Sequence, residues 1–204
     1  MISVLGYAAA DVVPTWVLAL SALTLWGPYI GVLLWVSKRN GSGSFVQDFA
    51  LRFQVKDLWG IPLGMVSQLV LVVLVTLPFQ WMFPSLFNKE AVEKRANELF
   101  AAAQGAWIVL LVFVVVICAP LVEEIVYRGF IQHNLAVAYG ARISLLLASF
   151  WFAAVHLQLA EFPGLFAFAL VLGFCFSRTK RLGLSIVTHV SFNATALTVM
   201  ALTR

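Results

Sequence analysis

The sequence has few charged residues for its length. Of its 204 residues, 9 are Asp or Glu and 13 are Lys or Arg, so 11% carry charge, whereas 62% are hydrophobic. Soluble domains have about 25% charged and about 45–50% apolar residues. The shortage of polar side chains excludes a water-soluble globular domain, and the abundance of hydrophobic ones excludes an intrinsically disordered chain.

Cysteine is also scarce, and no run of basic residues is long enough for a nucleic-acid surface. The two cysteines, Cys118 and Cys175, lie in apolar runs, so they predict neither a disulfide framework nor a Cys-x-x-Cys metal site. The formal net charge is +4, but Lys and Arg stand in short clusters between apolar runs. Such clusters are typical of membrane topology signals, so we expect no nucleic-acid partner.

Apolar runs of membrane-spanning length recur along the whole chain. A helix needs about 20 predominantly apolar residues to cross a bilayer. The segment 45–56 has phenylalanines at i, i+4 and i+8 and is predicted to be an interfacial amphipathic helix, and 88–100 is predicted to be a solvated helix. The expected spans are 12–36, 58–83, 107 into the segment LVEEIVYRGF, 143–159, 165–176 and 182–202.

These segments predict an all-α fold, a polytopic transmembrane helix bundle of about six spans plus interfacial helices. The basic loops favour an arrangement with both termini outside the cytoplasm. We expect a multi-pass protein of the plasma membrane with the lipid bilayer as its surroundings. Residues 1–204 would form a single membrane domain.

Two adjacent acidic residues, Glu123 and Glu124, stand within the third span. An acidic side chain at the centre of a membrane helix costs about 2.5–3.5 kcal/mol on insertion scales. Arg128 follows Glu124 by four residues, so these two can pair on one face of the helix. Glu123 points about 100° away and has no such local partner. Its carboxylate is therefore a candidate general base or acid.

Later spans carry further polar residues at helical spacing. His156 follows Phe152 by four residues, and Asn193 follows His189 by four, so each pair shares a helix face. A single intramembrane His or Asn can serve as a hydrogen bond between helices, and Glu123 could be a second partner of the arginine. The joint occurrence of so many polar groups on three helices favours a functional site.

Three ordered motifs resemble those of a known family. EExxxR runs from Glu123 to Arg128, FxxxH ends at His156, and HxxxN runs from His189 to Asn193. Together they resemble the CAAX protease and bacteriocin-processing family, also called the CPBP or ABI family, of intramembrane peptidases. The resemblance covers about residues 119–193. It implies hydrolysis of a peptide bond in a membrane-associated protein or peptide, prenylated CAAX-type proteins included.

The resemblance also implies roles for the polar residues. Glu123 would activate water as a general base, and His156 would help to orient or deprotonate that water. His189 and Asn193 would stabilise the oxyanion that develops on the scissile carbonyl.

A second set of residues would support the catalytic ones. Glu124 and Arg128 would form a supporting pair, and Phe152 would pack behind the histidine of its motif. In this interpretation residues 12–100 supply the N-terminal spans and the extramembrane helix, and 107–202 form the catalytic core.

The chemistry leaves one choice of cofactor open. The resemblance implies a glutamate-dependent mechanism, so no cofactor is expected, and the HExxH signature of zinc peptidases is absent. The alternative is Zn²⁺ held by Glu123, His156 and His189, which would make a three-ligand site with an open position.

Two other classes of function remain as alternatives. A non-catalytic membrane scaffold or bacteriocin-immunity protein could use the same cavity for binding. A proton-coupled transporter also uses intramembrane Glu and His residues, but the chain lacks paired, broken segments in two corresponding halves. The identity of the substrate and the oligomeric state stay open at this stage.

Overall fold

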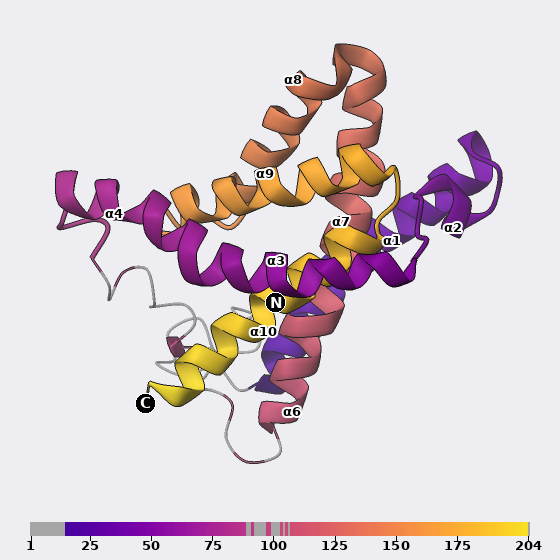
Figure 1. The fold of residues 1–204 in the computed structure, drawn as a ribbon. Helices are drawn as coiled ribbons and strands as arrows, with labels where there is room; N and C mark the ends of the chain where they lie inside the picture. The colour runs from indigo at the N-terminus through magenta and orange to yellow at the C-terminus, as the bar shows by residue number, and fades with distance from the viewer. Residues whose placement is uncertain are drawn as a thin grey trace.

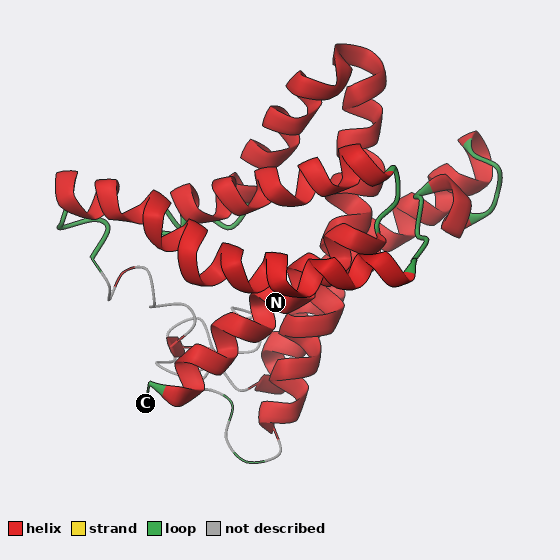
Figure 2. Cartoon of the chain, viewed as in Figure 1, coloured by secondary structure: helices red, strands yellow, loops and turns green. Residues whose placement is uncertain are grey.

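The computed structural model describes residues 15–88, the single residues 91, 97, 98, 103 and 105, and residues 107–203. In these ranges the chain is helical and contains no strand (Figure 2). Most of the solvated helix predicted over 88–100, and the first residues of the predicted span 12–36, lie outside the described residues.

The described fold consists of helical elements, many of which follow one another directly in the chain (Figure 1). The label η marks two kinds of element: η1 is a short 3-10 helix, and η2, η3 and η4 are π-helical segments. In chain order the elements are α1 (Thr15–Asn40), α2 (Phe45–Asp48), the 3-10 helix η1 (Val55–Trp59), α3 (Gly60–Val66), η2 (Ser67–Leu71), α4 (Val72–Met82), α6 (Trp107–Val112), η3 (Phe113–Cys118), α7 (Ala119–Glu124), η4 (Ile125–Gln132), α8 (His133–Ala154), α9 (Phe162–Thr179) and α10 (Gly183–Leu202).

Among the described residues, five continuous helices are long and apolar enough to cross a membrane. The prediction of an all-α, polytopic transmembrane bundle is confirmed. One of the five, Trp107–Ala154, is 48 residues long and contains the third predicted span and most of the fourth. Gly140 lies at its kink with φ 79° and ψ 167°, a backbone conformation that glycine alone adopts readily. The chain therefore folds back within α8, as the upper part of Figure 1 shows.

The amphipathic helix predicted over 45–56 is wrong. Only Phe45–Asp48 is α-helical, and the backbone leaves the right-handed region at Ala50, where φ is 52°. The Ala50 carbonyl accepts a hydrogen bond from the amide of Leu182, 2.9 Å away, at the start of α10. This contact between distant parts of the chain outweighs the local helical pattern of the phenylalanines.

An ion pair at η1 joins two basic loops. Asp57 in η1 is buried and forms an ion pair with Arg181, which precedes α10, and it also accepts a hydrogen bond from the Gln54 amide at 2.7 Å. The loop before α3 and the loop before α10 are thereby held at one end of the bundle. This proximity agrees with the common membrane side that their charge predicts.

Two glycines let α3 lie directly against α10. A Cβ atom at Gly60 would lie 2.7 Å from the backbone nitrogen of Thr188, and one at Gly64 would collide with the Thr188 carbonyl oxygen. Small residues at helix interfaces in membranes allow such close backbone approach. The contact sets the position of α10 and of His189, which follows Thr188 directly.

Candidate active site

A buried ion pair forms the base of the site. Glu124 is fully buried, and its Oε1 atom lies 2.9 Å from Nη1 of Arg128, one helical turn later. The Nη2 group of Arg128 donates to the Ala169 carbonyl of α9 at 3.1 Å, and its guanidinium carbon lies 4.7 Å from the centre of the Phe152 ring. These contacts bond the guanidinium on both sides of the pair, whereas Oε2 of Glu124 is buried without a hydrogen-bond partner among the described residues.

His189 connects this ion pair to the carboxylate of Glu123. Its Nδ1 atom lies 2.9 Å from Oε1 of Glu124, and its Nε2 atom lies 3.8 Å from Oε2 of Glu123. The ring is held edge-on by Phe152 and Phe168, with centroid distances of 5.8 and 5.4 Å. Only 3% of His189 is exposed, so this imidazole lies behind Glu123 and is shielded from the cavity.

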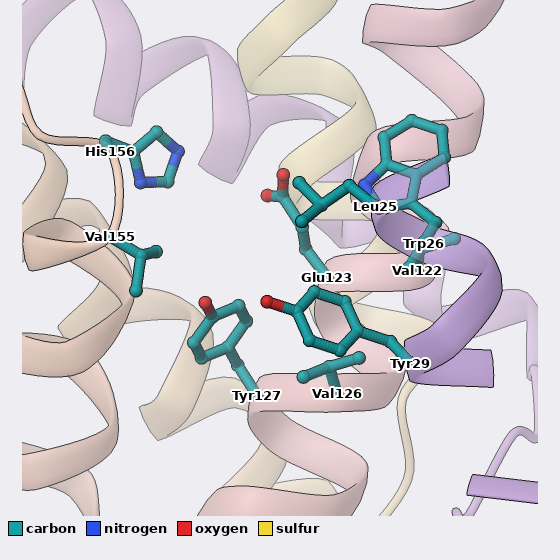
Figure 3. Close-up of a pocket in the computed structure, with 9 residues that line it drawn as sticks. All are labelled: Leu25, Trp26, Tyr29, Val122, Glu123, Val126, Tyr127, Val155 and His156. Carbon is teal, nitrogen blue, oxygen red and sulfur yellow. The ribbon is translucent and has the colours of Figure 1, made fainter. Parts of the chain in front are cut away.

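Glu123 and His156 line one cavity, shown in Figure 3. Its volume is about 210 Å³, and 23% of the Glu123 side chain is exposed. The two residues are 33 positions apart in the sequence, and the hairpin at Gly140 brings them together. The lining residues are Leu25, Trp26, Tyr29, Val122, Glu123, Val126, Tyr127, Val155 and His156.

The orientation of the His156 ring, which lies in the turn after α8, is set by the last turn of that helix. Its Nδ1 atom lies 2.7 Å from the Phe152 carbonyl oxygen, and the two rings are 4.9 Å apart. A carbonyl oxygen can only accept, so Nδ1 donates, and in the neutral ring Nε2 is the nitrogen without a proton. The ring can thus present a basic nitrogen to a molecule in the cavity.

Asn193 lies apart from the cavity lining. Its Nδ2 group donates to the Val115 carbonyl at 2.8 Å, where η3 widens the regular hydrogen-bond ladder of the helix. In this arrangement the amide joins α10 to η3. The oxyanion role predicted for Asn193 from the family resemblance stays a prediction, and it requires the second N–H of this amide to reach the substrate.

Sequence reasoning missed the contribution of α1. Leu25, Trp26 and Tyr29 line the cavity opposite the motif residues, and their spacing of three and four places them on one helix face (Figure 3). Tyr127, inside the EExxxR motif, was also missed. The spacing in α1 was visible in the sequence, but no motif connected this helix to the third span.

The zinc alternative can be compared with the arrangement of these side chains. Within the described ranges, no group of three or more His, Cys, Asp or Glu residues converges closely enough to hold a metal ion. Glu123, His156 and His189 are therefore not gathered as zinc ligands here. The expectation that no cofactor is needed stays a prediction.

Comparison with known proteins supports the motif assignment. A family model described as type II CAAX prenyl endopeptidase Rce1-like matches residues 105–195. No curated protein and no solved structure matches the chain. The matched segment contains all three motifs and the hairpin between them, while α1 lies outside it. The resemblance to CAAX proteases is confirmed: residues 105–195 of this multi-pass membrane protein are similar to the Rce1-like family of type II CAAX prenyl endopeptidases.

Proposed function

We propose that the protein is an intramembrane endopeptidase that hydrolyses a peptide bond by means of water activated by Glu123. The family match supports peptidase activity in general. The observation that carries the glutamate mechanism is that Glu123 and His156 border one cavity, whereas the neighbouring Glu124 is fully buried in an ion pair. Of the two motif glutamates, Glu123 alone is placed to meet a water molecule and a substrate.

The reaction follows from the chemistry of these groups. Glu123 takes a proton from water, and the water oxygen forms a bond to the scissile carbonyl carbon while His156 Nε2 accepts a hydrogen bond from the same water. The carbonyl electron pair moves to oxygen and gives a tetrahedral oxyanion. When this intermediate collapses, the C–N bond breaks and the proton held by Glu123 passes to the leaving amine.

The buried network positions the base. Because Arg128 and His189 both contact Oε1 of Glu124, that carboxylate is fixed, and it in turn orients the imidazole. The Nε2 atom of His189 then faces Glu123, where it can share the proton that the carboxylate takes from water. Groups preorganised in this way need little rearrangement during the reaction.

The cavity is suited to an apolar peptide segment at the membrane. Leucine and valine side chains form much of its wall, from Leu25 on α1 to Val122, Val126 and Val155. We propose a membrane-associated protein or peptide as substrate, with prenylated CAAX-type proteins as the first class to test, and the plasma membrane as the location.

Cleavage of a membrane-peptide library, prenylated peptides included, tests the proposal. The full chain reconstituted in liposomes is expected to cleave members of the library, and Glu123→Ala or His156→Ala is expected to abolish turnover while the protein still inserts and folds. Undiminished cleavage by Glu123→Ala would refute the glutamate mechanism. Binding of peptides without cleavage by the wild type would favour the scaffold or immunity alternative.

A further inference from the structure

A groove of about 670 Å³ lies between α3, α8, α9 and α10. Among the described residues it shares none with the lining of the cavity that Glu123 and His156 border. Leucine, valine, phenylalanine and cysteine side chains form its walls, and Arg178 in the last turn of α9 is the charged residue in its described lining. Along α9 the groove extends from Leu170 to Arg178, about 12 Å. It is thus a separate apolar groove with a cationic group at one end.

A second arginine lies toward the same end of the groove. Leu145 of α8 lines the groove and packs against Gly173 of α9, where a Cβ atom would collide with its Cδ1 atom. After the kink in α8, α9 turns back beside the second limb of that helix (Figure 1). Arg142 comes one helical turn before Leu145, on the same face of α8. Because the two helices run in opposite directions, Arg178, which follows Gly173 on α9, lies toward the same end as Arg142. Both arginines are exposed.

The helices that carry these two arginines contain no acidic residue to neutralise them. After Glu124 the chain has one acidic residue, Glu161, which precedes α9 and so lies at the opposite end of that helix. Asp57, near the start of α10, is buried in its ion pair with Arg181. This end of the groove therefore has an excess of positive charge, which favours an anionic partner.

The helix dipole explains only one of the two arginines. A cation in the last turn of a helix, as at Arg178, is stabilised by the dipole of that helix. Arg142 is the second residue after the kink at Gly140, so it lies in the first turn of its limb, where the dipole disfavours a cation. A bound ligand with negative charge would offset that cost.

Apolar walls by themselves do not select a ligand inside a membrane. Lipid tails are as apolar as leucine side chains, so the walls have no hydrophobic preference for one lipid over another. The preference must come from the headgroup and the arginines at the end of the groove. The basic loops predict that this end faces the cytoplasm, and the cytoplasmic leaflet carries anionic lipids.

We propose that this groove binds an anionic phospholipid, with an acyl chain along α9 and the headgroup phosphate on Arg142 and Arg178. The guanidinium carbon of Arg178 lies 5.8 Å from the centre of the Phe174 ring, which is itself part of the wall, so the cation is held beside the place of the chain. Guanidinium groups bind phosphate oxygens through two parallel hydrogen bonds. This lipid site goes beyond the proposed peptidase function and holds whether or not Glu123 activates water.

Competition between two lipids for the full chain in detergent micelles tests the site. Phosphatidylglycerol and phosphatidylcholine with identical acyl chains are added at equal concentration, and native mass spectrometry counts the molecules of each that stay bound. One basic residue near an anionic lipid contributes a factor of about 5 in affinity, so two arginines predict a preference of roughly 25-fold for phosphatidylglycerol. Equal binding of the two lipids by the wild type would overturn the proposal.

Arginine variants test where the headgroup binds. Arg178→Gln and Arg142→Gln are each expected to lower the preference to about fivefold, and the double variant is expected to remove it. Arg39→Gln is the matched control, because the Arg39 guanidinium lies over the Trp35 ring at 5.6 Å, as that of Arg178 lies over Phe174, but on α1. Thermal unfolding without added lipid checks that each variant is folded. An Arg178→Gln protein that keeps the preference of the control would overturn the proposal.

Three further measurements distinguish the lipid from other occupants of the groove. Val171→Phe narrows the groove and is expected to weaken binding of phosphatidylglycerol by at least about fivefold, the lower end of an overpacking penalty, and unchanged binding would contradict the proposal. Inorganic phosphate in excess is expected to leave the lipid bound, whereas displacement would show that only the headgroup is recognised. Displacement of the lipid by an uncharged farnesylated peptide would assign the groove to a substrate chain. Lipid-free dimers of the wild type that Val171→Phe abolishes would assign it to a second copy, and each of these last three results would overturn the proposal.

Discussion

Glu123 and Glu124 are adjacent in the sequence, yet their carboxylates have opposite surroundings. The Glu123 side chain is 23% exposed toward the cavity, whereas that of Glu124 is fully buried and lies 2.9 Å from Nη1 of Arg128. His189 links the two through its opposite ring nitrogens. This difference supports our proposal that Glu123 is the base and that Glu124 supports it.

Substitution of each glutamate should separate these roles. Glu124→Gln leaves the Arg128 charge buried without its partner, so we expect a loss of about 3–5 kcal/mol in the free energy of unfolding. Glu123→Gln is expected to change stability by less than about 0.5 kcal/mol, as for a partly exposed substitution, while turnover is lost. Unfolding in detergent micelles, followed beside peptide cleavage, measures both effects. Equal destabilisation by the two variants would contradict this division.

Arg128→Lys tests the geometry of the buried pair. A lysine ammonium cannot reproduce the two separate contacts of the guanidinium, to Glu124 on its own helix and to the Ala169 carbonyl on α9. We expect a loss of about 1–3 kcal/mol, the range for a buried polar group left unsatisfied. A double-mutant cycle with Glu124→Gln should give a coupling energy different from zero, and additive losses would mean that the pair contributes little.

Gly64→Ala tests the close contact between α3 and α10. The added methyl group would collide with the Thr188 carbonyl oxygen, so the helices must separate, at an overpacking penalty of about 1–3 kcal/mol. Gly31→Ala is the matched control, because a Cβ atom at Gly31 in α1 meets no other atom within 4 Å. Thermal unfolding of both variants checks the comparison. A Gly64→Ala protein as stable as the control would show that α10 is not held by this contact.

Removal of metal ions tests the cofactor expectation. Cleavage of a library peptide should persist after exhaustive chelation, since we propose that Glu123 and His156 activate the water by themselves. Metal analysis of the purified protein accompanies the assay. Activity that disappears with chelation and returns on addition of Zn²⁺ would favour the alternative in which Glu123, His156 and His189 bind the ion.

The spans could be predicted because each depends on a local property, the run of apolar residues that a bilayer requires. The break between the third and fourth predicted spans is located by the structure at Gly140, a residue that tolerates φ of 79°. The helix over 45–56 could not be predicted correctly, because the amide of Leu182, more than 100 residues away, determines the conformation at Ala50.

For the site, the sequence by itself determined the chemical groups, their order and the pairing of Glu124 with Arg128 across one helical turn. Only the tertiary structure decided which glutamate meets the cavity, that the Asn193 amide bonds Val115, and that Tyr29 of α1 completes the wall. The physical reason is that helical spacing specifies neighbours within a helix, whereas contacts between helices depend on packing surfaces such as those at Gly60 and Gly64.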